Sequence, residues 1–286
     1  MRAIWADALL VVYLVATSVV LLVGWRRVPP VAIVLHLAVL VAMAAAAWLR
    51  VVPRWLAMWA PLIALLFLYT ELPALIAAAG HARFFDADVM RWEGGVFGSQ
   101  PALVWAARWP SPLLRELLHG AYLSYYAIIF AVPVALYAQR RQDEFGEAMV
   151  ALMLTFVACF VCYIVFPVAG PRYGMGHESS RVSRGLLRPA VLWLLERGSS
   201  RGTAFPSSHV AVAVAQSILA LRYYGRRGLV IAALSAGLAL GAVYGGFHYA
   251  IDILVGAPFG ALTCHAGLRL AAALRRRAQA NASAPT

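Results

Sequence analysis

The sequence contains no lysine and few charged residues of any kind. Only 13% of its 286 residues are charged, whereas 63% are hydrophobic. Soluble domains carry about 25% charged residues, so this composition excludes an ordinary soluble protein. The missing lysine also excludes any reaction that proceeds through a lysine Schiff base.

Cysteine is scarce as well, and its three copies lie inside apolar segments. Cys159 and Cys162 have the spacing of half a metal site, but the sequence offers no second pair to complete it. We therefore interpret Cys159, Cys162 and Cys264 as small buried hydrophobic residues.

The chain lacks both an internal repeat and a polar segment long enough to form a soluble domain. Apolar runs of about 20 residues, enough to cross the hydrocarbon core of a bilayer, recur from end to end. The sequence therefore predicts an all-α, polytopic membrane helix bundle. Prolines punctuate the boundaries, and the expected spans are Ala8–Val23, Val31–Leu49, Trp55–Ala79, Leu117–Tyr137, Ala148–Pro167, Ser208–Tyr223, Leu229–Tyr244 and Tyr249–Ala271.

No small-x-small cleavage pattern accompanies the first apolar run, which ends before Arg26 and Arg27. We expect this run to be a retained span and not a removed signal peptide.

The net charge of +12 would suggest a nucleic-acid partner in a soluble protein. Here most arginines lie in short turns between apolar runs, where phospholipid headgroups are the natural counter-ions. We expect membrane lipids as partners and no nucleic acid, and the sequence leaves the oligomeric state open.

The arginine distribution also predicts an orientation. Counting spans places both termini on the face whose arginines concentrate in short turns, which the positive-inside rule assigns to the cytoplasm. Arg26 and Arg27 oppose this assignment. We expect an integral protein of a bacterial plasma membrane, with its termini cytoplasmic and the loop 168–204 outside. In either orientation, span parity brings this loop, His209 and His248 to one membrane face.

Residues 83–109 are too polar to cross a membrane. Apolar residues such as Phe85, Val89 and Trp92 alternate there with Asp86, Glu93 and other charged residues. This pattern is typical of an interfacial helix that lies in the headgroup layer. The helix is either a lid that contributes only packing or a segment that contacts substrate.

Two histidines and one carboxylate stand out at the starts of apolar helices. His248 and Asp252 are four residues apart, so their side chains lie on one helix face and can meet. A carboxylate bonded to one ring nitrogen fixes the tautomer and leaves the other nitrogen nucleophilic. His209 can supply a proton to a leaving group.

A helix start and an arginine complete this constellation. Ser207 and Ser208 follow a proline where a serine can cap the helix, and free N–H groups at such a start attract an anion. Arg172, in the preceding loop, can bind phosphate oxygens bidentately. Together these groups are the parts that phosphoryl transfer needs, namely positioning and charge stabilisation.

The remaining polar residues have plainer interpretations. We interpret His36, His81, His119 and His265 as residues at the amphipathic edges of helices. Glu71 lies within the third span without an evident partner in the sequence. An ionisable residue in a span tends to mark function, so for Glu71 a structural and a functional role remain open.

The two helix starts resemble motifs of the type 2 phosphatidic acid phosphatase superfamily. Its Pro-Ser-Gly-His motif is similar to Pro206-Ser207-Ser208-His209, and its Ser-Arg segment leading to His-x3-Asp is similar to Gly241–Asp252. Gly241-Ala242 stands where the Ser-Arg pair would be. The resemblance covers about residues 83–260, and Phe85-Asp86 and Phe97–Pro101 resemble the branch of inositol phosphorylceramide synthase.

The resemblance implies a role for each residue and no metal or other cofactor. His248 would be the nucleophile that forms a phosphohistidine, Asp252 would orient it, and His209 would be the general acid. For the arginine-containing motif, Gly170-Pro171-Arg172-Tyr173 has the position expected in the synthase-type branch, while Arg181 and Arg188-Pro189 fit the general pattern. The candidate phosphate-binding residues are thus Arg172, Tyr173, Ser207, Ser208, Arg181 and Arg188.

The resemblance also implies an architecture and a function. We expect N-terminal transmembrane helices in residues 1–79, a phosphatase-like membrane domain in 80–271 and a disordered cytoplasmic tail in 272–286. The bundle would hold a six-helix core, two additional N-terminal spans and an interfacial helix. The expected activity is a lipid phosphatase or a phosphotransferase that uses an alcohol such as inositol. The alternatives are a lipid transporter or flippase without hydrolysis and an inactive scaffold.

Overall fold

The computed structural model describes residues 4–49, 53–174 and 185–283. This part of the chain is an all-α, polytopic helix bundle without strands, and its one β-type pairing is the isolated bridge between Val168 and Thr203. The helices of the N-terminal region are α1 (Ile4–Val23), η1 (Trp25–Arg27), α2 (Pro30–Leu49), α3 (Arg54–Tyr69) and α4 (Leu72–Ala79). The chain continues through α5 (Asp86–Phe97), α6 (Pro101–Arg108), α7 (Pro112–Leu123), α8 (Tyr125–Ala138), α9 (Gln142–Val165), α10 (Pro171–Gly174), α11 (Leu187–Gly198), α12 (Ser208–Tyr224), η3 (Gly225–Gly228), α13 (Leu229–Tyr244) and α14 (Ala250–Ser283).

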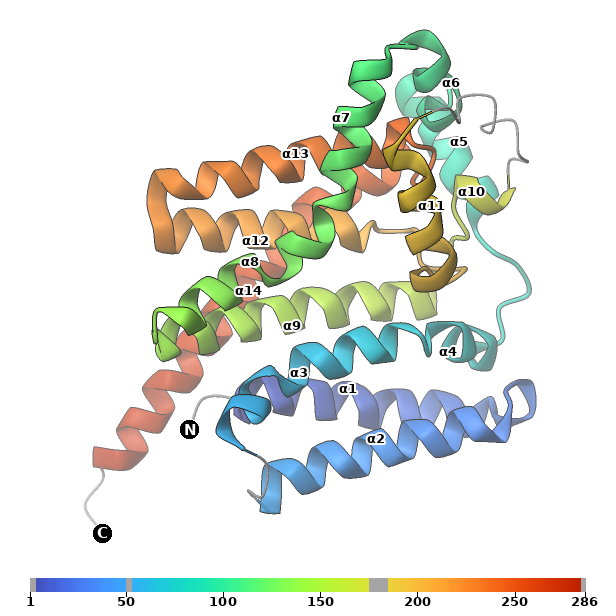
Figure 1. Cartoon of the computed structure of the whole chain (residues 1–286). Coiled ribbons are helices and arrows are strands. Elements are labelled where there is room, and N and C mark those ends of the chain that lie inside the picture. Colours follow the sequence, from blue (N-terminus) through green and yellow to red (C-terminus); the bar gives the residue numbers. More distant parts are fainter. Residues whose placement is uncertain (1–3, 50–52, 175–184, 284–286) are drawn as a thin grey trace.

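Several helices are long and apolar enough to cross a membrane. Within the described residues, four helical stretches qualify: Trp5–Val23, Gln142–Val165, Ser208–Tyr244 and Ala250–Ala282. The bent pair α7–α8 would make a fifth if it is one span. The stretch Ser208–Tyr244 contains α12 and α13, which fold back on each other through η3 (Figure 1). The predicted spans at Val31–Leu49 and Trp55–Ala79 fall on shorter apolar helices, α2 and α3 with α4.

The bundle is built around α9, which packs against α14, α12, α8 and α1. Its buried side chains are mostly apolar. Gly256 and Gly260 let α14 approach its neighbours closely. A Cβ at Gly260 would lie 2.2 Å from the backbone oxygen of Ala211. This contact fixes the start of α14 beside the start of α12.

One end of the bundle gathers the segments that sequence parity predicts to share a face. The end of α9, the start of α12 and the end of α13 lie there with α10 and α11, away from both chain termini (Figure 1). The predicted co-location is therefore confirmed. The loop 168–204 is not a plain loop, because it contains α11, which packs on α7.

Three boundaries differ from the sequence-based expectation. The third span breaks at Thr70 and Glu71, where Pro73 restarts the helix as α4. The fourth span begins earlier, at Pro112, and bends by 44° at Ser124. The interfacial segment is two helices and not one, because Gly98 adopts a left-handed conformation (φ +64°) and Pro101 starts α6.

The predicted disordered tail is also wrong for the residues that the structure describes. Helix α14 continues to Ser283. The side chain of Arg275 donates to Glu147 at 3.0 Å and to Asp143 at 2.9 Å, which ties this part of α14 to α9. The alanine and arginine residues that follow are strong helix formers, so the helix continues beyond the packed core.

Two histidines assigned to amphipathic edges are in fact buried. His36 contacts Glu71, and His119 lies beside Arg188 and the ring of Phe247. His265 is exposed, as expected, and His81 is an exposed residue that hydrogen-bonds the carbonyl of Ile164. Helical periodicity assigned both residues to the edge of their own helix. It could not predict their burial, because the residues that cover them are distant in sequence.

Candidate functional site

A small pocket opens at the end of the bundle where these segments meet. Arg172, His209 and His248 all contribute to its lining. The rest of the lining comes from α3, α7, α10, α11, the segment 199–204 and the loop before α14, and includes Tyr69, Tyr122, Tyr173, Leu195, Ser199, Ser200, Thr203 and Phe247. Four of the predicted site residues thus share one cavity although they lie up to 76 positions apart.

His248 and Asp252 form the pair that their spacing predicts. The Nδ1 of His248 lies 3.1 Å from Oδ2 of Asp252, which also accepts the N–H of Tyr249 at 2.9 Å. Both side chains are buried, with 5% and 0% of their surface exposed. Because the carboxylate accepts at Nδ1, the Nε2 of a neutral His248 carries a lone pair. The hydroxyl of Ser207 lies 3.3 Å from this nitrogen.

The loop before α14 aims His248 at the pocket. Gly246 adopts a left-handed conformation (φ +70°) that reverses the chain after α13. The N–H groups of Phe247 and His248 then both donate to the carbonyl of Ala242, at 2.9 and 3.1 Å. Burial lowers the pKa of His248 to about 4, against a smaller opposing effect of the Ala204 backbone. The ring is therefore neutral at neutral pH, as a nucleophile requires.

The start of α12 is held in place by three hydrogen bonds. Ser207 caps the helix by accepting the N–H of Val210 at 3.4 Å, so the predicted cap is confirmed. The hydroxyl of Tyr163 accepts the N–H of Ser208 and donates to the carbonyl of Pro206, both at 3.0 Å. These bonds fix the helix start beside the pocket. Ser208 itself is buried and does not contribute to the lining.

His209 faces His248 across the pocket, with 5.5 Å between the ring centroids. Its ring packs against Tyr122 and Tyr125, whose centroids lie 5.5 and 4.3 Å away. The Nε2 of His209 lies 3.5 Å from the Tyr122 hydroxyl. The two histidine rings thus meet edge to face and line the same pocket.

Arg172 is the arginine that the structure places in the pocket. It lies on α10, half-buried, and its Nη2 donates to the hydroxyls of Tyr173 at 2.6 Å and Ser199 at 2.8 Å. It belongs to none of the ion pairs formed among the described residues. Its charge is therefore available to an anion in the pocket. Tyr173 also lines the pocket and is 40% exposed.

Of the other candidate arginines, Arg188 does not line the pocket. Arg188 is 6% exposed, donates to the carbonyl of Gly245 at 3.1 Å and lies over the ring of Phe247. Burial lowers its pKa. It therefore supports the loop that carries His248. Arg181 lies outside the described residues.

Ala242, which stands where the family motif has an arginine, is buried and leaves no space for a larger side chain. Ala242 is fully buried among Tyr122, Val191, Leu195 and Phe247. A long charged side chain there would have to displace this apolar cluster. The charge in the pocket must accordingly come from elsewhere, and Arg172 provides it.

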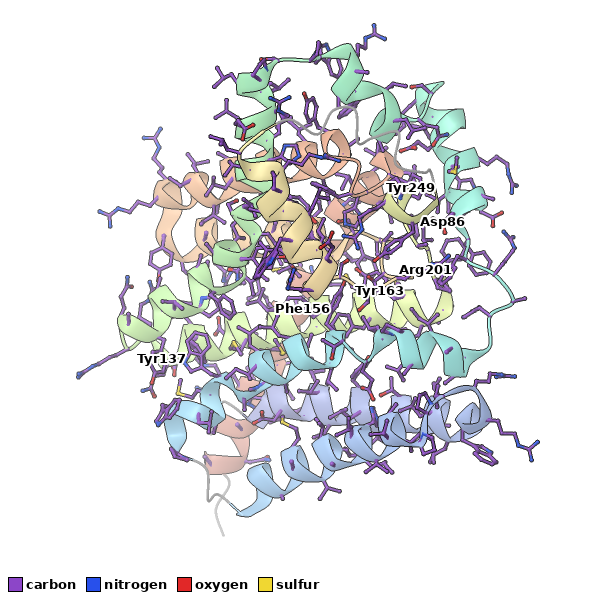
Figure 2. The ribbon with its side chains drawn as sticks, turned by 45° about the vertical axis from the view of Figure 1, so that its right-hand side comes forward. Asp86, Tyr137, Phe156, Tyr163, Arg201 and Tyr249 are labelled. Atoms are coloured by element: carbon purple, nitrogen blue, oxygen red, sulfur yellow. The ribbon has the colours of Figure 1, made fainter. Side chains whose placement is uncertain are left out.

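Two carboxylates of α5 were not recognised as site residues from the sequence. Asp86 accepts the N–H groups of Ala169 and Gly170 at 2.9 and 2.8 Å and the hydroxyl of Tyr249 at 3.1 Å. Figure 2 shows Asp86 and Tyr249 close together at this end of the bundle. Glu93, two helical turns along α5, accepts the N–H of Ala250. We call these two carboxylates the α5 clasp, because they bind the loops on either side of the pocket.

A sequence signal for the α5 clasp exists. Asp86, Val89 and Glu93 follow the i, i+3, i+7 spacing of one helix face, so both carboxylates share the face of a buried valine. An acidic residue on the apolar face of an amphipathic helix needs a partner. Here the partners are the backbone N–H groups of the loops.

Replacing Glu93 with glutamine is expected to change how stability depends on pH. Burial, aided by the nearby Asp252 carboxylate, raises the pKa of Glu93 from 4.5 to about 7, although the Ala250 N–H favours the ionised form. The unfolded chain therefore releases this proton at lower pH than the folded chain, and folded-state stability falls as the pH rises through this window. As the pH rises from 4.5 to 7, the Tm of the wild type should fall relative to the Tm of Glu93→Gln. Above pH 7 the difference between the two Tm values should stay constant.

Thermal unfolding in detergent at fixed ionic strength measures this difference. Asp88→Asn is the matched control, because Asp88 pairs with Arg83 and Arg91 on the exposed side of the same helix. It should keep the wild-type pH dependence. A Glu93→Gln protein whose Tm follows the wild-type pH profile would contradict the prediction.

Across the part of the chain that the structure describes, no group of three or more His, Cys, Asp or Glu side chains is arranged to hold a metal ion. Cys159, Cys162 and Cys264 are free thiols, of which Cys159 and Cys264 are buried and Cys162 is half-buried.

The bundle and its pocket define a class of membrane-embedded protein in which an aspartate-held histidine, a second histidine and an arginine meet at one end. The family model described as the PAP2 superfamily matches residues 87–266. The chain belongs to this superfamily of phosphatase-type hydrolases. No curated protein and no solved structure matches the chain.

Proposed function

We propose that the protein is a lipid phosphatase or phosphotransferase that acts through a phosphohistidine on His248. The observation that carries this proposal is the pocket in which a neutral His248, held by Asp252, lies with His209 and Arg172. Superfamily membership supports a lipid phosphoester as the substrate.

The geometry supports a two-step reaction. In the first step, Nε2 of His248 forms a bond to phosphorus as the bond to the leaving oxygen breaks, and His209 gives that oxygen a proton. The carboxylate of Asp252 stabilises the positive charge that develops on the imidazole. Arg172 stabilises the charge on the phosphate oxygens. In the second step, water or an alcohol attacks phosphorus and passes its proton to His209, and the bond between phosphorus and Nε2 of His248 breaks.

The wall of the pocket supports transfer to an alcohol as well as hydrolysis. The side-chain hydroxyls of Tyr173 and Ser199 belong to lining residues beside Arg172. Such groups hydrogen-bond a polyol without a net charge. We therefore propose an acceptor such as inositol, as in the branch of the family that resembles inositol phosphorylceramide synthase, with the pocket on the extracytoplasmic face of the membrane.

Mass spectrometry of the products from labelled phospholipid, with and without inositol, tests the proposal. Free phosphate without inositol, replaced by a phosphorylated acceptor when inositol is added, is the result expected of a transferase. Phosphate in both samples indicates a phosphatase. Vanadate should inhibit, because it adopts the geometry of the transition state, whereas chelators should leave the rate unchanged. Movement of intact lipid across a liposome membrane without a new product would instead indicate a transporter.

A further inference from the structure

The pocket contains a residue from outside the segment that defines the family. The family match begins at residue 87, whereas Tyr69 lies at the end of α3 and belongs to the pocket lining together with Arg172 and His248. The helices before residue 87 therefore help to build the pocket.

Tyr69 holds the segment that leads into α12. The hydroxyl of Thr203 donates to the carbonyl of Ser200 at 2.6 Å, so at 2.8 Å from the Tyr69 hydroxyl it can only accept. Tyr69 is therefore the donor of that bond. The carbonyl of Tyr69, free at the end of α3, accepts the hydroxyl of Ser200 at 3.2 Å.

This segment connects to both sides of the catalytic pocket. The N–H of Ala204 donates to the carbonyl of Val168 at 2.9 Å, and the N–H of Val168 donates to Gly202 at 3.3 Å. Val168 comes four residues before Arg172, and the backbone of Ala204 contacts the ring of His248. A shift of Thr203 would therefore move the arginine and the histidine together.

The break that brings Tyr69 to the pocket is held from the other side by the N-terminal hairpin of α1 and α2. Glu71 lies two residues after Tyr69, and its carboxylate oxygens are 2.8 and 2.9 Å from Nδ1 of His36. His36, on α2, is 1% exposed. A buried pair of ionisable groups in a membrane bundle is costly unless it is well bonded.

The His36–Glu71 pair is fully bonded. The Nε2 of His36 is 3.0 Å from the carbonyl of Leu14 and 3.1 Å from the hydroxyl of Ser18, which itself donates to that carbonyl. Both neighbours accept, so Nε2 carries a proton. A second proton lies between Nδ1 and the Glu71 carboxyl group. The pair thus joins α1, α2 and the α3–α4 break.

We propose that Tyr69 is a positioning residue of the pocket and that the His36–Glu71 pair fixes the helix break from which Tyr69 reaches it. The helices before the family segment are then part of the working site and not only a membrane anchor. The kinetic part of the test rests on the proposed function.

Tyr69→Phe keeps the ring and removes the bond to Thr203. It should lower kcat about tenfold per folded molecule, with KM changed less than about twofold, because the lost bond positions catalytic groups and does not bind substrate. Thr203→Val should have the same effect, and the double variant should be no worse than either single one. Glu71→Gln should also lower kcat. In the double variant with Tyr69→Phe, the two losses in kcat should not add.

Tyr13→Phe is the matched control. Tyr13 is a buried tyrosine of α1 whose hydroxyl has no hydrogen-bond partner in the structure. Its loss should leave kcat and KM at wild-type values. Wild-type kcat in both Tyr69→Phe and Glu71→Gln, or additive losses in the double variants, would overturn the proposal.

Hydrogen–deuterium exchange separates this proposal from the proposed function. The backbone N–H groups of Val168 and Ala204 should exchange faster in Tyr69→Phe and Glu71→Gln than in the wild type, whether or not the protein is active. If the wild type releases no phosphate from lipid phosphates, the proposed function fails, and faster exchange at these two positions still supports the positioning role. Unchanged exchange there overturns it.

Discussion

Replacing His248 with alanine is expected to abolish turnover of lipid phosphate. The wild-type imidazole is neutral, buried and held by Asp252 at 3.1 Å, and His248 belongs to the pocket lining. His248 is the nucleophile of the proposed mechanism, so the rate should fall by at least about 10³-fold. The measurement is steady-state phosphate release in detergent micelles.

Trapping the proposed phosphohistidine tests the role of His248 without a measurement of turnover rate. Substrate labelled at phosphorus should leave an acid-labile, base-stable label on the wild-type protein and none on His248→Ala. His265→Ala is the matched control, because His265 is an exposed histidine on the same helix as Asp252. Turnover that is unaffected by the loss of His248, or a label that persists in His248→Ala, would contradict the proposed mechanism.

Arg172→Ala is expected to have the second largest effect, a loss of roughly 10²–10³-fold in kcat/KM, as is typical when a group that stabilises transition-state charge is removed. Arg172 is the arginine of the pocket lining, and Ser199 and Tyr173 hold its guanidinium in place. Arg172→Lys should recover only part of the loss, because an ammonium group cannot form two parallel bonds to phosphate.

Vanadate affinity provides a second readout for Arg172. It should weaken in Arg172→Ala by a factor similar to the loss in kcat/KM, since both depend on the same charge. Arg197→Ala is the control, because Arg197 is exposed on α11, where it stacks on Trp193. If Arg172→Ala retains wild-type kcat/KM and vanadate affinity, another residue must bind the phosphate.

Local spacing predicted part of this site correctly. His248 and Asp252 are four positions apart and form the predicted pair, although His248 lies in the loop just before α14 and not on a shared helix face. A serine after Pro206 at the start of an apolar helix predicted the cap that Ser207 forms. The alternation of span directions placed both helix starts and the loop 168–204 at one end of the bundle.

Contacts between distant segments could not be predicted in this way. Glu71 has no partner within its own span, and its partner His36 comes from a helix 35 positions earlier. The same holds for Asp86, which bonds Ala169 and Gly170 from more than 80 positions away. Periodicity describes which face a residue occupies and not which segment covers that face.

The choice among the candidate arginines shows most clearly what local sequence patterns can predict and what tertiary packing decides. Arg172, Arg181 and Arg188 all fit a family pattern, and no local signal ranks their distances to His248. Packing of α11 turns Arg188 toward Gly245 and Phe247, whereas the short helix α10 presents Arg172 to the pocket.

The sequence by itself determined the membrane class, the paired histidine and aspartate, and the end of the bundle at which they lie. These properties follow from apolar run length, helical periodicity and alternating direction, which are local or additive along the chain. Only the tertiary structure decided that Tyr69, the α5 clasp and Arg172 surround them. Each of those contacts depends on how helices distant in sequence pack and where they break, which is a property of the whole bundle.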